Sequence, residues 1–525
     1  MDDQNMTFRP SFVERTTISI FHLVNRVVPW FKLPSLIGAM NLAFMRVELR
    51  GYNLHDGYAS ASDKFNSLEL PRMGCTGMRL GRNFPREHCQ KPTEEQLWSP
   101  NPRLISEKFI ARKEGGFIPA IILNLLAAAW IQFQTHDWFN HELDRENEPY
   151  DIPLPPGYSW QGKMMLLKTK PDDILDPSDM KCPGYKNINT AWWDGSQIYG
   201  SEEATRALRA SHPDGKLELA ENGTGAFILR DKDGNPRTGF NDNWWVSIEM
   251  LYTLFALEYN TLCDMFRKVY PNWTGDQIFN KARLVNSVLI DNIAFFEAKH
   301  GKHQTITPVV DLTFKNAQKP LELGISFSDL FYSFGVNYPG AITNNNYPNF
   351  LHDLHTPDGL HRDMGTVDIV RDRERGVPRY CAFRRMLRIK APKTFEELTG
   401  SNKELAAQLS EVYNGDIELV DALVGSYSEP VIPGFGFSEA AFRIFIAIAS
   451  QRLKSDRFIA GQWNTEMYTK EGFYWVQHIT MKDVLIRYFP ELEDTLKNSK
   501  NTFAPWAMKP ESKNYQGIET NAKKT

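Results

Sequence analysis

Residues 117–141 read FIPAIILNLLAAAWIQFQTHDWFNH and form the most apolar stretch of the chain. A helix that spans a membrane needs about 20 residues with little polar content. Asn124, Gln132, Gln134 and His136 interrupt this stretch. We therefore expect a helix buried in the protein core, and the rest of the fold is interpreted around it.

Gln132 and His136 are four residues apart, so they project from the same face of that helix. On an apolar wall, the histidine could exchange a proton with a bound peroxide while the glutamine amide orients the ligand. The alternative is a hydrogen-bonded core histidine without a catalytic role. Asp137 points about 100° around the helix from His136, so it can serve a different site.

A downstream segment, TAWWDGS at residues 190–196, places oxygen groups at alternate positions. These are the side chains of Thr190, Asp194 and Ser196 and the backbone carbonyl of Trp192. In an extended loop they would face one side together with Asp137, as hard ligands suited to Ca²⁺. The alternative is a capped turn that binds no ion.

Composition restricts the class of protein. The chain has 525 residues, with 60 Lys and Arg against 64 Asp and Glu and a formal net charge of −4, which does not suggest a nucleic-acid-binding surface. Hydrophobic residues make up 42%, as in ordinary globular proteins. The five cysteines form no CxxC pair, and the polar, acidic N-terminus does not resemble a signal peptide. We expect a cytoplasmic protein without disulfides.

Helical periodicity indicates a mainly α fold. Beyond the 117–141 stretch, helical patterns recur at 241–300, 403–425 and 437–457. In residues 11–50, apolar positions recur at helical spacing, with Arg and Lys at intervals. This pattern is typical either of a segment lying on a membrane surface or of a helical hairpin packed on the body. We therefore divide the chain into an N-terminal segment, 1–50, and a catalytic unit, 51–525.

Two further features involve charged residues. The segment RDRERGVPRY at 371–380 carries six charges in ten residues, which is typical of a solvated loop. Arg452 follows the apolar part of FRIFIAIASQRLKSDRF, so its guanidinium could meet a carboxylate at the edge of a pocket. A surface arginine is the alternative.

These motifs together resemble the fatty-acid α-dioxygenases, a branch of the animal-type haem peroxidase superfamily that also includes the cyclooxygenases. The matching segments occur in the family's order: GMRLGRN (77–83), QFQTHDW (132–138), NTAWWDGSQIYGS (189–201), NTLCD (260–264), KARLV (281–285), RDRERGVPRY (371–380), ASQR (449–452) and DRF (456–458).

The resemblance implies a helical, haem-peroxidase-like fold that holds haem b and one calcium ion. It implies that His136 is the distal histidine with Gln132 as its partner, and that Arg452 binds the substrate carboxylate. It also implies that Asp137, Thr190, Trp192, Asp194 and Ser196 are the calcium ligands. In this family peroxide and haem generate a tyrosyl radical, which abstracts a hydrogen from a fatty acid before O₂ adds to give a 2-hydroperoxy acid.

The chain departs from the family's pattern near residues 296–325. The family has a Y-x-x-H element in this region, whose tyrosine carries the radical and whose histidine is the proximal iron ligand. Here the chain is shortened and the element is missing. Tyr52 and His55 form a Y-x-x-H in the wrong order for the family, while His300 and His303 lie near the junction without a matching tyrosine. The proximal ligand is therefore unknown.

Three hypotheses remain open. The chain is an oxygenase with a displaced proximal ligand, such as His300 or His303. Alternatively, it is a catalytically inactive, shortened paralogue that binds lipid or a membrane surface. The third hypothesis is that the chain joins the two flanks of a longer coding sequence. The resemblance favours the enzyme, with a fatty acid, O₂ and hydrogen peroxide as reactants.

Overall fold

The computed structural model describes most of the chain between the two terminal segments. The described residues are 12–27, 63, 66–67, 73–80, 90–113, 116–155, 163–171, 184–202, 213–222, 225–238, 240, 243–293, 312–322, 324–356, 359–432 and 436–508.

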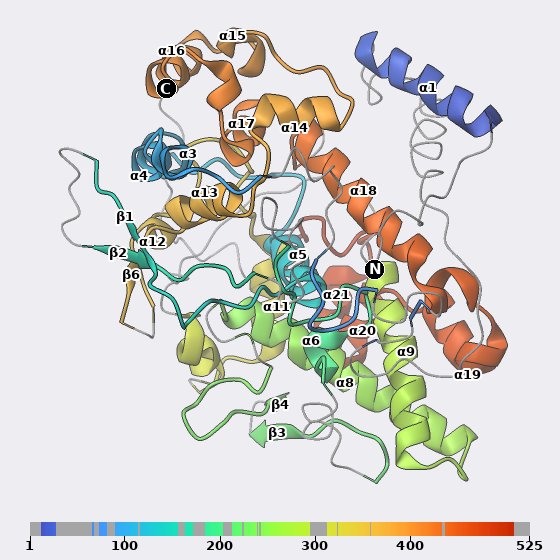
Figure 1. Ribbon diagram of the computed structural model, residues 1–525. Helices are drawn as coiled ribbons and strands as arrows, with labels where there is room; N and C mark the ends of the chain where they lie inside the picture. Colours follow the sequence, from blue (N-terminus) through green and yellow to red (C-terminus); the bar gives the residue numbers. More distant parts are fainter. Residues whose placement is uncertain are drawn as a thin grey trace.

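The described part of the chain is mainly helical, as expected (Figure 1). The longer helices are α1 Phe12–Val27, α5 Leu125–Trp138, α8 Val246–Val269, α9 Gly275–Ile293, α11 Phe327–Val336, α13 Met364–Glu374, α16 Lys403–Val412, α18 Glu439–Ser455, α19 Thr465–His478 and α20 Met481–Tyr488. The shorter ones are α3 Glu94–Trp98, α4 Pro102–Ile105, α6 Ser196–Tyr199, α10 Lys319–Glu322, α12 Asn349–His352, α14 Tyr380–Met386, α15 Phe395–Leu398, α17 Ala422–Ser428 and α21 Glu493–Leu496. Turns of π-helix span Ser106–Ile110 and Arg457–Gly461, and 3-10 turns span Phe314–Gln318, Ile417–Leu419 and Pro490–Leu492.

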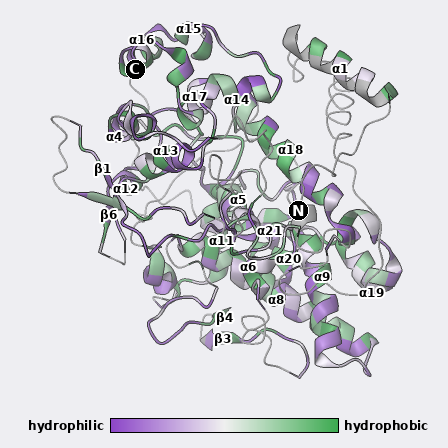
Figure 2. Cartoon of the chain, in the orientation of Figure 1, coloured by the Kyte–Doolittle hydropathy of each residue, from purple (hydrophilic) through white to green (hydrophobic). Residues whose placement is uncertain are grey.

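Strands are few and short. In the part of the chain that the structure describes they form three antiparallel hairpins: β1 Tyr150–Ile152 with β2 Met164–Leu166, β3 Leu219–Asn222 with β4 Gly225–Ile228, and β5 Leu354–His355 with β6 His361–Arg362. Most helices carry hydrophobic and hydrophilic residues together (Figure 2), as expected for helices that bury one face. Among the described helices, none is both long enough and apolar enough to cross a membrane.

The apolar stretch that decides the fold forms α5, which lies in the middle of the molecule (Figure 1). The helix is shorter than the predicted range 117–141 because Asn124 caps it. The Asn124 Oδ1 accepts a hydrogen bond from the Ala127 amide at 3.1 Å, and its Nδ2 donates to the carbonyls of Thr502 and Ala504. This buried asparagine therefore both starts α5 and attaches it to the C-terminal part of the chain.

The main hydrophobic core surrounds α5 and α8. Phe133 of α5 packs against Tyr252 and Phe255 of α8, with ring centroids 5.1 and 5.5 Å apart. Helices α9, α11, α19 and α20 complete this core. Glu258 of α8 is buried, where it accepts hydrogen bonds from Trp475 at 2.7 Å and Tyr488 at 2.9 Å and pairs with Arg487. Helix α8, which packs against α5, is thus held in place by contacts with α19 and α20.

A second core forms between the π-helical turn at 106–110 and helices α13 to α17. The prediction that residues 371–380 form a solvated loop is wrong, because residues 371–374 are the last turn of α13. Arg373 is 4% exposed and its guanidinium donates to both oxygens of buried Asp421 at 2.8 Å. Pairing with a partner 48 residues away is what allows these charges inside.

Candidate active site

His136 lies in the last turn of α5 and is 3% exposed. Its Nδ1 is 3.0 Å from the Tyr252 hydroxyl, and its ring stacks on Phe240 with centroids 4.2 Å apart. Burial lowers the pKa of His136 to about 3, so the imidazole is neutral at physiological pH. Its Nε2 is buried and has no hydrogen-bond partner among the described residues. A neutral imidazole with a vacant nitrogen can exchange a proton with a ligand.

Gln132 lies one turn before His136 and is held by the segment that leads into α8. Its Oε1 accepts a hydrogen bond from the Trp245 indole at 2.7 Å, and its Nε2 donates to the Asn243 carbonyl at 3.0 Å. Both Gln132 and His136 therefore contact the beginning of α8 or the residues before it, as their shared helix face requires. The glutamine amide is oriented by these two bonds.

A cavity of about 800 Å³ lies beside the two rings that contact His136. Tyr252 and Phe240 form part of its wall, and Asn189 and Ser196 contribute from the segment that carries the predicted calcium ligands. Its size falls in the range of small-molecule sites. No histidine is among the described residues that line it.

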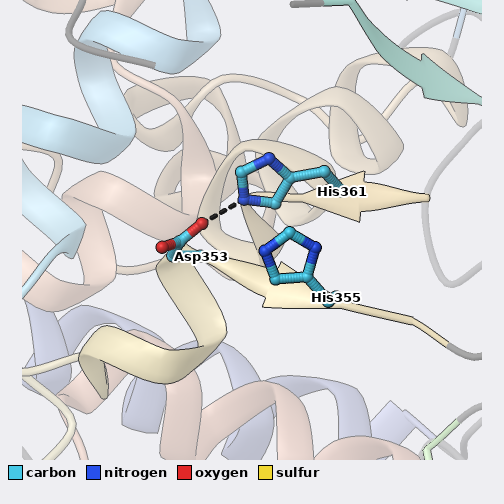
Figure 3. Close-up of side chains that lie close together, drawn as sticks. All are labelled: Asp353, His355 and His361. Carbon is cyan, nitrogen blue, oxygen red and sulfur yellow. Dashed lines mark hydrogen bonds and ion pairs between the residues drawn. The ribbon is translucent and has the colours of Figure 1, made fainter. Parts of the chain in front are cut away.

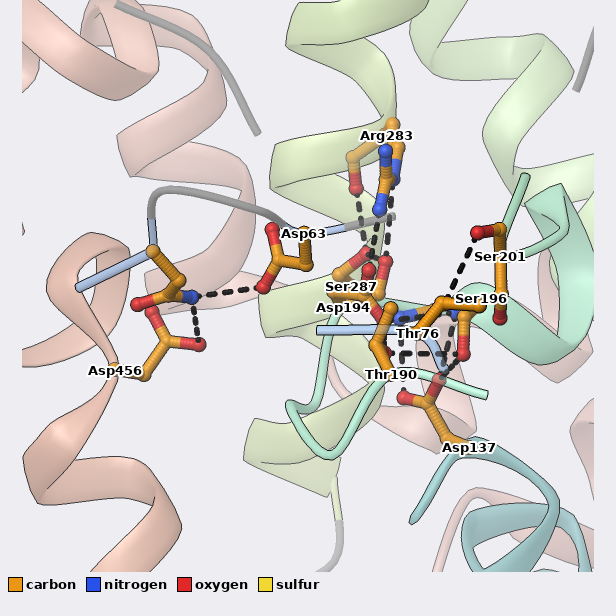
Figure 4. A network of polar contacts seen from close by, with 12 residues as sticks. Asp63, Thr76, Asp137, Thr190, Asp194, Ser196, Ser201, Arg283, Ser287 and Asp456 are labelled. Carbon is orange, nitrogen blue, oxygen red and sulfur yellow. Dashed lines mark hydrogen bonds and ion pairs between the residues drawn. The ribbon is translucent and has the colours of Figure 1, made fainter. Parts of the chain in front are cut away.

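Asp137 belongs to a buried cluster of polar groups (Figure 4). Its Oδ1 accepts hydrogen bonds from the Ser196 amide at 2.6 Å and the Ser196 hydroxyl at 2.7 Å, and its Oδ2 accepts one from the Gly195 amide at 3.0 Å. Burial, with the nearby charge of Asp194, raises the pKa of Asp137 to about 8. The site thus holds two acidic groups at a cost that a bound cation would offset.

Asp194 and Thr190 complete this cluster. The Thr190 hydroxyl donates to Asp194 Oδ1 at 2.8 Å and lies 3.4 Å from the Ser196 hydroxyl. The other oxygen of Asp194 forms an ion pair with Arg283 of α9 (Figure 4). Four of the five predicted calcium ligands therefore meet in one place. Their carboxylate and hydroxyl oxygens are the donors that Ca²⁺ prefers.

The segment that carries these residues differs from the predicted extended loop. It bends and then enters α6 at Ser196, so its oxygens converge by curvature instead of alternating along a strand. Gly195 makes the bend with a φ of 72°, and a Cβ there would meet Ser287 Oγ and the Tyr199 ring at 2.7 Å. The fifth predicted ligand, Trp192, is buried, and its indole donates to the Met73 carbonyl at 3.3 Å.

Arg452 lies on α18 beside a different face of α5. Its guanidinium carbon is 4.9 Å from the Trp138 ring centroid. Trp138 and His136 are two residues apart, so they point about 200° apart around the helix, and the structure does not bring Arg452 to the His136 face. Burial lowers the pKa of Arg452 to about 10, and its buried Nη1 has no partner among the described residues. The guanidinium is still charged at neutral pH.

His300, His303, Tyr52 and His55 lie outside the described residues.

Several residues that organise the site were not identified from the sequence. Arg283 lies in a motif that the sequence singled out, yet its ion pair with Asp194, 89 residues earlier, could not be inferred from spacing. A lone arginine on the apolar face of a helix was the available signal. Tyr252 gave no signal in the sequence, because a tyrosine within a core helix is common. Asn189, which donates to the His136 carbonyl at 2.7 Å, also belongs to a quoted motif.

Comparison with known proteins fits this geometry. The profile of the animal haem peroxidase family matches residues 58–298 and residues 291–503. The chain belongs to the animal haem peroxidase family. Relatives that match over nearly the whole chain include alpha-dioxygenases: Alpha-dioxygenase 2 of Arabidopsis thaliana is 31% identical, with 96% of this chain and 95% of the relative covered.

Solved structures of the family have the same fold. The crystal structure of a fatty acid alpha-dioxygenase of Arabidopsis thaliana matches with a TM-score of 0.82 and 28% identity, covering 96% of this chain and 94% of that one. A tyrosine-to-phenylalanine variant of the Oryza sativa fatty acid alpha-dioxygenase, with palmitic acid in its crystal structure, matches with a TM-score of 0.82 and 27% identity over 95% and 98% of the two chains. The predicted fold class and family are confirmed.

The comparisons also locate the departure from the family. The alignment with the Arabidopsis relative runs over 617 positions although this chain has 525 residues, so the relative carries segments that this chain lacks. The two matches to the family profile meet at residues 291–298. This is where the sequence predicts that the Y-x-x-H element is missing.

Proposed function

We propose that the protein is a haem-dependent fatty-acid α-dioxygenase. One C–H bond at the α-carbon breaks, O₂ adds to that carbon, and the hydrogen ends on the outer oxygen, so RCH₂COOH and O₂ give RCH(OOH)COOH. The observation that carries this proposal is the similarity to alpha-dioxygenases over 96% of the chain. The buried His136, whose Nε2 has no hydrogen-bond partner among the described residues, supports it, and a cavity of suitable size lies beside the Tyr252 and Phe240 rings that contact His136.

Haem, when bound, would supply the oxidising power for this reaction. The residues present fit the distal side of that group, because His136 is neutral, buried and vacant at Nε2. We propose that His136 takes up the proton of a hydroperoxide there and returns it. Tyr252 fixes the tilt of the imidazole through Nδ1, and Gln132 lies on the same face.

The candidates for a protein ligand to the haem iron, His300 and His303, lie outside the described residues. The two family matches meet at residues 291–298, and we propose that His300 or His303, close to that junction in the sequence, would hold the haem. Haem iron needs a firm axial ligand. Binding of haem is therefore the step on which the whole proposal depends.

Arg452 is proposed to bind the substrate carboxylate. It is a half-buried cation whose buried Nη1 lacks a partner among the described residues, and a carboxylate would satisfy that nitrogen. The indole of Trp138 stacks beneath the guanidinium and holds it in place.

Asp137, Thr190, Asp194 and Ser196, with the carbonyl of Trp192, are proposed to bind Ca²⁺. The proposal rests on the convergence of two carboxylates and two hydroxyls in a buried cluster. Calcium bound there would connect α5 to the 190–196 segment. Because Asp137 directly follows His136, the ion would also fix the end of the helix that carries the catalytic imidazole.

Peripheral contact with a membrane is proposed for α1. Phe12, Val13, Ile20 and Leu23 are 55–77% exposed, and at 100° per residue they fall within one face about 100° wide. A fatty-acid substrate partitions into membranes, so a surface helix would bring the enzyme to it. We keep the division into an N-terminal segment, 1–50, and a catalytic unit, 51–525, and the cytoplasmic location, as parts of this proposal.

The proposed function is tested by titrating haemin into the purified chain in calcium-containing buffer and then adding palmitic acid with a trace of peroxide. We expect a stoichiometric Soret band, uptake of O₂ and formation of 2-hydroperoxypalmitic acid detected by mass spectrometry. His136→Ala should keep the Soret band and lose about 10²–10⁴-fold in rate, since it removes only the proton acceptor. His478→Ala, on an exposed residue of α19, is the matched control.

A broad band that does not saturate, with no hydroperoxide, would overturn the proposal. It would favour the second candidate, a catalytically inactive paralogue that binds lipid. Loss of the Soret band in His136→Ala would instead make His136 an iron ligand and would contradict its distal role.

A further inference from the structure

Three side chains on one surface hairpin could hold a metal ion far from the buried calcium cluster in sequence. Asp353, His355 and His361 each offer one ligand atom, and these atoms lie within 4.8 Å of one another (Figure 3). Asp353 and His355 are exposed and His361 is half-buried. The family resemblance assigned no role to any of them.

The backbone register places the three ligands on one face. His355 of β5 pairs directly with His361 of β6, so their side chains project from the same side of the hairpin. Asp353 caps the end of α12 directly before β5, and its Oδ1 reaches the same side because it contacts His361 Nε2. Leu354, which alternates to the other side, is 6% exposed and anchors the hairpin to the protein body.

The side chains already interact, as Figure 3 shows. His361 Nε2 forms a hydrogen bond with Asp353 Oδ1, and the two imidazole rings stack with centroids 4.3 Å apart and planes 8° from parallel. Four-coordinate zinc with bonds of roughly 2.0–2.2 Å needs ligand atoms roughly 3.4 Å apart. Small rotations of exposed side chains close this difference, and a cation would accept a nitrogen from each of the two rings.

Two imidazole nitrogens and one carboxylate oxygen form a donor set for a borderline metal such as Zn²⁺, in contrast to the all-oxygen set around Asp137. A fourth position would remain for water. His352 does not belong to the set, because its Nδ1 is 3.0 Å from Asp363, a fully buried carboxylate that also caps α13. The contact between His352 and Asp363 attaches the residue before Asp353 to the beginning of α13 and so fixes the backbone next to the three ligands.

We propose that Asp353, His355 and His361 bind one zinc ion. The ion would clamp the β5–β6 hairpin where the chain passes from α12 to α13. Because the site is open to solvent, the ion would exchange readily, and it would stabilise the folded protein increasingly as the free zinc concentration rises.

The test uses the full chain, stripped with a chelator and kept in excess Ca²⁺ so that the carboxylate cluster is occupied. Zn²⁺ is titrated by calorimetry, and Co²⁺ serves as a spectroscopic substitute whose visible bands report a four-coordinate site. We expect one ion per chain and a higher Tm with zinc. His355→Ala and Asp353→Asn should each weaken binding at least ~10-fold. Both residues are exposed, so neither variant should impair folding.

His478→Ala is the matched control, since this exposed histidine stacks on Tyr474 outside the hairpin. It should bind zinc like the unmodified protein. Zinc binding of equal strength in His355→Ala and Asp353→Asn would overturn the proposal. A Co²⁺ spectrum typical of six oxygen ligands would overturn it as well.

Discussion

At the scale of single residues, His136 and Asp137 are neighbours on α5 but contact different parts of the protein, because the helix rotates between them. His136 stacks on Phe240 and contacts the Tyr252 hydroxyl, while Asp137 accepts three hydrogen bonds in the polar cluster. The sequence predicted this separation from a rotation of about 100° per residue. The structure brings Asp137, Thr190, Asp194 and Ser196 together, and their role as calcium ligands stays a prediction.

The calcium cluster leads to a prediction about single substitutions. Without a cation the buried carboxylates of Asp137 and Asp194 repel, so Ca²⁺ should stabilise the folded chain. At a calcium concentration one hundred times the Kd the gain is about 2.7 kcal/mol. Asp137→Asn should abolish the rise in Tm with calcium, because it removes one of the two charges. Thermal unfolding in calcium and in chelator measures this difference.

Glu142→Gln is the control for this prediction. Glu142 is an acidic residue a few positions further along, paired with Lys186 at 2.9 Å outside the cluster. Its replacement should leave the response to calcium unchanged. A calcium response that persists in Asp137→Asn would show that the ion binds elsewhere.

At the scale of elements, the positions of the long helices were predictable and the environment of charged segments was not. Periodicity placed α8, α9, α16 and α18 within the expected ranges, because the residues of their buried faces recur at helical spacing. The sequence did not predict that α5 begins after Asn124, because a polar residue in an apolar stretch can either cap a helix or lie inside one. The burial of Arg373 was missed because its partner Asp421 is distant in sequence.

Helix α1 carries the prediction that belongs to this scale. If its exposed apolar face binds membranes, Ile20→Glu should weaken binding to anionic phospholipid vesicles at least ~10-fold, since burial of such a side chain is worth roughly 1.5–3 kcal/mol. Co-sedimentation with vesicles measures the effect. Ile325→Glu makes the same substitution at a 41% exposed isoleucine elsewhere and should have no effect. Equal binding of the two variants would contradict a membrane role for α1.

At the scale of the whole molecule, two cores share the chain. The first surrounds α5 and α8, and the second joins the 106–110 turn to α13–α17. Sequence motifs revealed the family because they lie in the segments that both matches cover. The motifs could not show how the two cores pack near the segment that relatives have and this chain lacks, because that packing depends on contacts between residues distant in sequence.

The dependence of stability on pH is also a property of the whole molecule, and α13 should contribute strongly to it. Burial raises the pKa of Asp368 to about 7, and burial together with the charge of Asp368 raises the pKa of Asp372 to about 7. The neighbouring Arg371 and Arg375 lower the pKa of Asp368 only in part. The ordinary value of both carboxyls is 3.8.

Between about pH 4 and pH 7 the folded chain therefore holds protons that the unfolded chain has released, so the free energy of unfolding falls as the pH rises. Asp368→Asn stays neutral and keeps an acceptor for the Tyr347 hydroxyl, 3.2 Å from the carboxylate. We expect the variant to match the unmodified protein at about pH 4.5 and to be more stable at about pH 8, on the order of 1–3 kcal/mol. Comparing the two proteins cancels the contributions of other groups. Urea unfolding across this range measures the difference, with the exposed Asp151→Asn as control; a difference that does not change with pH would show that Asp368 is ionised in the folded chain.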